Sequence, residues 1–235
     1  MTATIIDKTT SMVKEYMSAF DPSHDFLHVD RVRNLALFLA KECIKQGDVV
    51  DLEIVELAGL CHDVGDAKYY KGKQTGGDIV QSFLIDQGYR PDRAALVARI
   101  VNHIGFRKEL AWDDTKDDAA LVDWRNHCRE LHVVQDADKL DAIGAFGVMR
   151  CAAYSGATRV ALFDATIDPM RNMTKDQYEA QSTAKNGSAI NHFHEKLFRL
   201  KDMLRTEAGR RMGKERHEFM VQFVEQIRRE YNMQT

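Results

Sequence analysis

Histidine and aspartate residues, the first type, the second or both, are concentrated at three places in the sequence. These places are residues 23–28, 61–66 and 135–141. Imidazole nitrogens and carboxylate oxygens are donors that divalent transition metals accept. One set of four such side chains would supply two nitrogens and two oxygens: His28, His62, Asp63 and Asp138. This mixed set suits Mn, Fe, Co, Ni or Zn better than an all-oxygen Mg or Ca cage, and on an octahedral ion it leaves about two positions open for hydrolysis.

The pair His62-Asp63 is the most informative of these positions. An apolar helical pattern in residues 54–61 ends at the pair, and Gly65 then suits helix termination. Adjacent helical residues point about 100° apart, so both side chains reach one ion only beyond the helix end. We expect His28 to open the preceding helix and Asp138 to open, or lie in the first turns of, a later one.

A polyphosphate substrate would need cations besides the metal, because two carboxylates neutralise a divalent ion. The candidates are basic side chains close in sequence to the predicted ligands: Arg31, Lys68, Lys71, Lys73 and Lys139. Arg31 follows His28 by three residues and is predicted to share its helix face. For Lys139, phosphate binding and simple solvation are equally good interpretations.

Four further residues have both a chemical and a structural interpretation. Asp66 would accept a proton from the attacking water or balance a surface charge. His103 would protonate the leaving group or bind phosphate, or be a histidine stabilised by a helix C-terminus. His24 would orient a phosphate or cap a helix. Asp136 is interpreted as a helix N-cap or an outer hydrogen-bond acceptor rather than a direct ligand.

These interpretations define the predicted site. The predicted catalytic residues are Arg31, Asp66 and His103, and the predicted substrate-binding residues are His24, Lys68 and Lys139.

Helical periodicity recurs through almost the whole chain, and no stretch alternates convincingly with period two. The three prolines, Pro22, Pro91 and Pro169, lie in polar or turn-like stretches between periodic segments. We therefore predict an all-α fold, with nearly continuous periodicity over residues 133–154 and an irregular loop over 157–175. The 235 residues favour one domain, with C-terminal helices over about 186–231 that fold onto the core or form a subdomain.

Composition excludes several functions. The 33 Lys and Arg nearly balance the 36 Asp and Glu, which argues against general nucleic-acid binding through net charge. No apolar run approaches the ~18 residues of a membrane span. The four cysteines form no CxxC pair and fit reduced thiols. We expect a soluble, cytoplasmic protein, and the sequence leaves its oligomeric state open.

The ordered motifs resemble those of a known family. His28-Val29-Asp30-Arg31-Val32, then His62-Asp63, then Ala137-Asp138-Lys139-Leu140-Asp141 is similar to the H…HD…D signature of the HD-domain metal-dependent phosphohydrolase superfamily. The signature spans about residues 23–154. Longer segments resemble the bacterial YpgQ/YedJ-like branch: residues 23–28, 62–66, 102–104, 134–144 and 189–193.

This resemblance has specific implications. It implies a helical HD bundle with one divalent ion, for which Mn²⁺ is the expected occupant. It also implies that the ion is held by His28, His62, Asp63 and Asp138. The implied activity is a nucleotide pyrophosphohydrolase that converts (deoxy)nucleoside triphosphates to monophosphate and pyrophosphate.

Other activities remain open at this point. Some HD relatives are phosphomonoesterases, phosphodiesterases, ppGpp hydrolases or di-iron oxygenases. A di-iron site would need additional histidines, and only His103 is well placed, since His127 and His132 lie in a more polar segment. A nucleotide-binding regulatory module without turnover is the alternative from another class.

Overall fold

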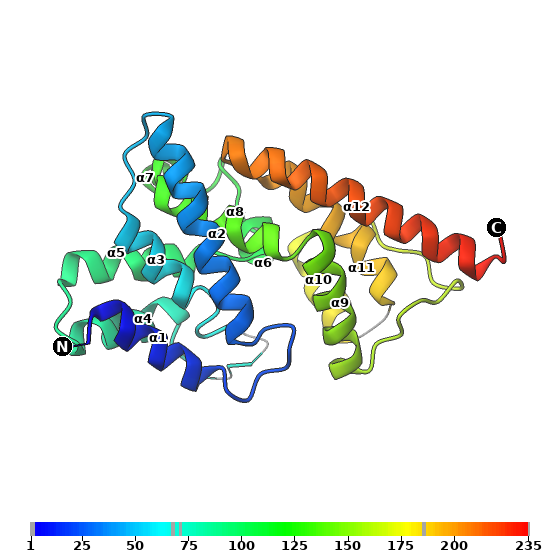
Figure 1. The fold of residues 1–235 in the computed structure, drawn as a ribbon, viewed down its shortest axis with the longest axis horizontal. Helices are drawn as coiled ribbons and strands as arrows, with labels where there is room; N and C mark the ends of the chain where they lie inside the picture. Colours follow the sequence, from blue (N-terminus) through cyan, green and yellow to red (C-terminus); the bar gives the residue numbers. More distant parts are fainter. Residues whose placement is uncertain (1–2, 67–68, 71, 185–186, 235) are drawn as a thin grey trace. The chain divides into compact units, whose positions relative to one another are not determined.

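Helices build the described part of the chain in the computed structural model (Figure 1), which describes residues 3–66, 69–70, 72–184 and 187–234. Within these residues there are twelve α-helices, one 3-10 helix (η1) and an isolated bridge between Ala161 and Ser188, but no strand. The bounds in the first part are α1 Ile5–Tyr16, α2 Phe26–Lys45, α3 Leu52–Cys61, α4 Gly76–Asp86, α5 Pro91–Asn102, α6 Phe106–Leu110, α7 Ala119–His127 and α8 Arg129–Asp141. They continue with α9 Gly144–Thr158, α10 Lys175–Ala184, α11 Ala189–Glu195, η1 Leu197–Met203 and α12 Glu207–Tyr231. The predicted all-α fold is confirmed.

Local capping explains where several helices begin. Thr4 and Thr75 form capping boxes at the starts of α1 and α4. The side chains of Asp25 and Asp51 accept backbone N–H groups at the starts of α2 and α3. Pro91 occupies the first turn of α5, where its missing N–H costs nothing. The capping side chains satisfy N–H groups that the first helical turn leaves without partners.

The chain forms two compact units, Met1–Phe20 with His24–Ala137, and Asp21–Ser23 with Asp138–Thr235. In the first unit α3 packs against α1, α2 and α5, and α4 packs against α5. Seven of the ten residues of α3 are buried, and Ile54, Leu57 and Leu60 are at most 1% exposed. A buried helix of this kind fixes the backbone from which the His62-Asp63 pair follows. The prediction of a single domain over the whole chain stays a prediction.

In the second unit α12 packs against α9 and η1, and α11 packs against α9 and η1. Residues between α9 and α10 are largely irregular, as the sequence predicts for that loop. Cys43, Cys61, Cys128 and Cys151 are free thiols in the two units. No helix in the described ranges combines the length and apolarity needed to cross a membrane.

The prediction of nearly continuous periodicity over residues 133–154 misses a break between α8 and α9. Ile143 is extended, with φ −124° and ψ 168°, and Gly144 has φ +74°. Side chains are rarely tolerated at such positive φ, whereas glycine is. Gly144 therefore lets the chain turn after Asp141 and start a new helix.

Two histidines of the second unit contact Phe198, with ring centroids 5.1 Å (His194) and 5.2 Å (His217) from that of Phe198. The Arg228 guanidinium donates to Nε2 of His194 at 3.0 Å. Burial, with the charge of Arg228, lowers the pKa of His194. Burial, with the charge of Lys201, lowers the pKa of His217. Both imidazoles are thus held in the neutral form.

This arrangement predicts a loss of stability in mild acid. An unfolded histidine titrates near ~6.5, so the stability that depends on neutral His194 is present above that pH and is lost as pH falls through the lower folded pKa. His194→Gln should therefore make the free energy of unfolding fall less steeply between pH 7.5 and 5 in urea titrations. His127→Gln, at a side chain 75% exposed, is the matched control and should keep the wild-type slope. Equal slopes in all three proteins would contradict the prediction.

Candidate metal centre

His62 is placed by the end of α3. It is the residue that follows Cys61, and its side chain is fully buried. Its Nδ1 lies 2.8 Å from the Gly59 carbonyl oxygen, which can only accept. Nδ1 therefore carries the proton, and Nε2 presents a lone pair, as in a histidine prepared to bind a metal.

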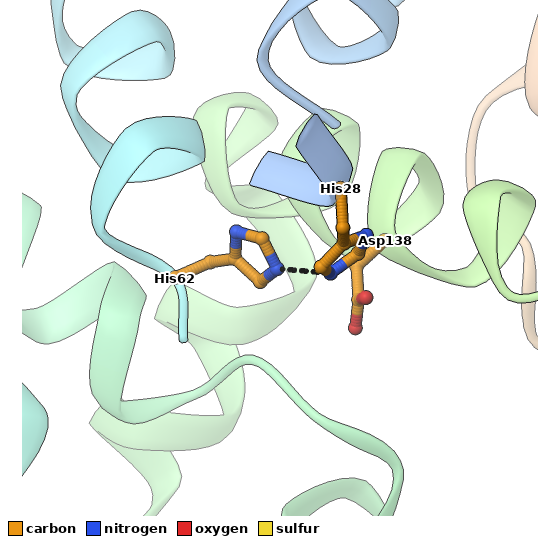
Figure 2. Close-up of side chains that lie close together, drawn as sticks. All are labelled: His28, His62 and Asp138. Carbon is orange, nitrogen blue, oxygen red and sulfur yellow. Dashed lines mark hydrogen bonds between the residues drawn. The ribbon is translucent and has the colours of Figure 1, made fainter. Parts of the chain in front are cut away.

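His28 is placed by the first turn of α2, where its backbone N–H donates to Oδ1 of the N-cap Asp25 at 3.0 Å. Its side chain is also fully buried. Figure 2 shows the two imidazoles with their Nε2 atoms directed toward each other. These atoms of His28 and His62 are 3.1 Å apart. The expectation that His28 opens its helix is confirmed.

Asp63 brings a carboxylate to the same point. Its Oδ2 lies 3.3 Å from Nε2 of His28 and 3.5 Å from Nε2 of His62. Oδ2 is buried and accepts no hydrogen bond of good geometry from the described residues. Burial raises the pKa of Asp63, but His62 and His28 outweigh this effect and hold the pKa well below its usual range. Asp63 is therefore ionised at neutral pH.

Asp138 completes the cluster. One donor atom from each of His28, His62 and Asp138 can be chosen so that all lie within 4.8 Å of one another (Figure 2). Asp138 continues α8 directly from Ala137, but it lies near the C-terminal end of this helix, so its predicted place in the first turns is wrong. The N-cap interpretation of Asp136 is wrong for the same reason, since Asp136 is fully buried inside α8. Because α8 already begins at Arg129, both aspartates lie late in the helix.

These residues fit a divalent ion. Two nitrogens at ~2.1 Å from one ion, at a right angle, are ~3.0 Å apart, close to the 3.1 Å between the imidazoles. A buried carboxylate oxygen with no hydrogen-bond donor is costly unless a cation compensates it. The candidate metal site therefore comprises His28, His62 and Asp138, with Asp63 beside the two imidazoles.

His24 lies next to this cluster. Its ring centroid is 6.1 Å from that of His28, and its Nδ1 is 3.1 Å from the Tyr69 hydroxyl. The Tyr69 ring in turn stacks on Phe20 at 4.1 Å. The charge of His24 contributes to the low pKa of Asp63. His24 is thus held by an aromatic contact and does not cap α2, because Asp25 does.

His103 follows the end of α5, as the sequence predicts. Its Nδ1 is 2.7 Å from the Arg99 carbonyl, and its ring packs edge-on to Trp124 at 4.9 Å. Gln135 of α8 donates to the His103 carbonyl at 2.9 Å. Burial lowers the pKa of His103, and the hydrogen bond to the Arg99 carbonyl offsets this in part. His103 is therefore largely neutral at pH 7.

The remaining predicted residues have mixed outcomes. Arg31, on α2, is half-buried. Asp66, three residues after Asp63, is also half-buried. Lys139 is only 4% exposed, so its interpretation as a solvated lysine is wrong. Lys68 and Lys71 lie outside the described residues. The roles of Arg31, Asp66, Lys68 and Lys139 stay predictions.

The segment after the His62-Asp63 pair is fixed by close backbone packing. A Cβ on Gly76, at the start of α4, would lie 2.0 Å from the Val64 carbonyl oxygen. The N–H of the following Gly77 donates to the Asn102 side chain at 2.9 Å. No flexible side chain can relieve the contact at Gly76, since it is made with backbone.

Gly76→Ala should therefore destabilise the protein by about 2–3 kcal/mol, the upper range for overpacking. Gly156→Ala is the matched control, because Gly156 lies in α9 and a Cβ added there would meet nothing within 4 Å. That change should stabilise by about 0.5–1 kcal/mol through helix propensity. Denaturant unfolding measures both, and a neutral Gly76→Ala would show that the contact relaxes without cost.

The fold and the site define the class of protein. The chain matches the HD domain family model over residues 26–143, which includes all four predicted ligands, and it belongs to this family. YpgQ of Bacillus subtilis is 31% identical over 226 residues, which cover 95% of this chain and 92% of YpgQ. The chain is therefore an HD-domain protein similar to YpgQ, with a candidate His-His-Asp metal site.

Solved structures agree with this assignment. The crystal structure of B. subtilis YpgQ in complex with ADP has a TM-score of 0.68 and covers 96% of this chain and 97% of its own. A Lactobacillus plantarum protein has a TM-score of 0.80 at 29% identity and covers 99% of both chains. An HD-superfamily hydrolase from Bacillus thuringiensis has a TM-score of 0.66 at 30% identity and covers 97% of this chain and 96% of its own.

Sequence reasoning missed two tyrosines near the cluster. Tyr69 contacts His24 across 45 positions, and nothing in its local sequence indicates this. The Tyr16 hydroxyl accepts the N–H of Gly65 at 3.0 Å and so fixes the turn after Asp63. Both contacts depend on long-range packing.

Proposed function

We propose that this protein is a metal-dependent phosphohydrolase that converts nucleoside triphosphates to monophosphate and pyrophosphate, with Mn²⁺ as its expected metal. The observation that carries the proposal is the convergence of two buried imidazole nitrogens and two carboxylates. The nucleotide part rests on similarity, because YpgQ was crystallised with ADP and is 31% identical over 95% of this chain.

His28, His62, Asp63 and Asp138 would hold the ion. A bound divalent metal supplies Lewis-acid stabilisation of phosphoryl oxygens and lowers the pKa of water. The Gly59 carbonyl holds His62 in the tautomer that presents Nε2. The low pKa of Asp63 keeps its carboxylate charged, so that ligand is available throughout the neutral range.

Other side chains must neutralise the negative charge of the substrate. Two carboxylates balance a divalent ion, so Arg31, Lys68 and Lys139 are assigned to the phosphates, with His24 as a further contact. Asp66 is assigned to receive a proton from the attacking water. Phosphoryl transfer asks for positioning and charge stabilisation more than for covalent chemistry from the protein, which this set supplies.

The tautomer of His103 supports a role in proton transfer. Nδ1 donates to the Arg99 carbonyl, so the neutral ring presents Nε2 as an acceptor. Because its pKa is lowered, the neutral form dominates at pH 7. We therefore assign His103 to hold a proton transiently or to accept a hydrogen bond. Protonation of the leaving group would require its charged form, which increases only in acid.

A coupled phosphate assay tests the proposal. Purified protein with Mn²⁺ is given nucleoside triphosphates, a phosphodiester, a phosphomonoester and ppGpp, each with and without added inorganic pyrophosphatase. Orthophosphate that is released from triphosphates only with pyrophosphatase supports the proposal. Direct orthophosphate, or turnover of the diester or ppGpp alone, would favour another hydrolase activity, and binding without any product would favour a regulatory module.

A further inference from the structure

Helix α9 contains one charged residue, Arg150, in the sequence GAFGVMRCAAYSGAT. Its side chain is only 12% exposed. A buried guanidinium is costly unless hydrogen bonds and an anion compensate it. An isolated charge in an otherwise uncharged helix is therefore expected to have specific partners.

Arg150 has two such partners, of which Ser23 is distant in the sequence and Asp141 lies on the preceding helix. Its Nε donates to the Ser23 carbonyl at 2.7 Å, and its Nη1 donates to Oδ2 of Asp141 at 3.1 Å. Asp141 is 1% exposed, so this ion pair is screened little by solvent. The rigid guanidinium thus fixes the distance between the Ser23 backbone and the last residue of α8.

Both partners lie next to candidate metal ligands in the chain. Asp141 follows Asp138 by three residues on the same helix, so holding the carboxylate of Asp141 restrains the helix turn that carries Asp138. Ser23 is itself restrained, because its N–H and hydroxyl donate to Oδ1 of Asp21 at 2.9 and 2.5 Å. Ser23 comes five residues before His28, just ahead of the N-cap of α2.

We propose that Arg150 is a positioning residue for the metal centre, which fixes the α8 end beside Asp138 and the turn that leads to His28. This inference rests on the proposed metal site. Arg150 need not contact the ion, since it acts through Asp141 and the Ser23 carbonyl. Outer hydrogen-bond partners of ligand-bearing groups typically change metal affinity by about 10–100-fold when they are removed.

Mn²⁺ titration of the full-length protein, followed by electron paramagnetic resonance of the free and bound ion, tests the inference. Arg150→Met and Asp141→Asn should each weaken Mn²⁺ binding by about 10–100-fold, and the double variant should weaken it by less than the product of the two, because both changes break one contact. Arg150→Lys keeps the charge but not the planar fork and should rescue part of the affinity. Arg229→Met is the control, since Arg229 is an exposed arginine of α12 that pairs with Glu225.

Circular dichroism and the melting temperature without metal show whether each variant folds. If Arg150→Met does not fold, Arg150→Lys and Asp141→Asn decide the question. Folded variants that bind Mn²⁺ as tightly as wild type would overturn the inference and leave the metal site intact, as would an equal loss in Arg229→Met. Wild-type protein that binds neither Mn²⁺ nor Co²⁺, Ni²⁺ or Zn²⁺ would overturn both the metal site and this inference.

Discussion

Replacing Asp63 by asparagine is expected to lower metal-dependent hydrolysis by about 1,000-fold or more, which corresponds to roughly 4 kcal/mol of lost transition-state stabilisation. The carboxylate lies 3.3 and 3.5 Å from the Nε2 atoms of His28 and His62. Asparagine keeps the size of the side chain but removes its negative charge. Its amide N–H₂ group would also compete with a cation for the two imidazole lone pairs.

Two measurements on this variant separate ligand loss from misfolding. Bound metal, determined by elemental analysis after gel filtration, should fall together with kcat/KM, while circular dichroism stays unchanged. Asp123→Asn, at a side chain 75% exposed, is the matched control and should retain wild-type activity. Full activity and full metal content in Asp63→Asn would show that Asp63 is not a ligand.

Removal of the metal is the second change with a large expected effect. Chelation should abolish hydrolysis, and Mn²⁺ should restore it. A ligand present at 100 times its Kd stabilises the folded state by about 2.7 kcal/mol, which for a protein of this size corresponds to a melting temperature about 5–10 °C higher than without metal. The physical reason is that a bound cation would offset the electrostatic repulsion among two imidazole lone pairs and a buried carboxylate that the fold holds close together.

Differential scanning calorimetry at increasing Mn²⁺ measures this shift. The melting temperature of the wild type should rise with metal concentration, whereas that of Asp63→Asn should rise little. Equal shifts in the two proteins would place the stabilising metal elsewhere. Hydrolysis that survives thorough chelation would show that the reaction does not depend on the ion.

The sequence was sufficient to predict the fold class and the ligand segments, because both depend on local patterns. The apolar run at 54–61 forms α3, and the His62-Asp63 pair follows its end. Asp25 and Thr75 are N-cap residues, a position that aspartate and threonine favour by residue type. Local hydrogen bonds and periodic burial determine such features, so they can be inferred without tertiary contacts.

The polar part of α8 shows why the rest could not be predicted. Gln135, Asp136 and Asp141 are at most 1% exposed, although polar residues at these spacings usually indicate a solvated helix face. Their burial depends on partners outside α8, such as the His103 carbonyl for Gln135 and Arg150 of α9 for Asp141. The single charge in α9 was a local signal for Arg150, but its partner lies in another helix.

Hydrolysis of a nucleoside triphosphate in ¹⁸O-labelled water, followed by ³¹P nuclear magnetic resonance, tests the central claim most directly. With Mn²⁺ and wild-type protein, we predict nucleoside monophosphate and pyrophosphate, with one ¹⁸O in the product that carries the phosphorus attacked by water. Neither product should form with chelator, and Asp63→Asn should form them about 1,000-fold more slowly or not at all. Orthophosphate and nucleoside diphosphate as products, or the predicted products at the wild-type rate from Asp63→Asn, would contradict the claim.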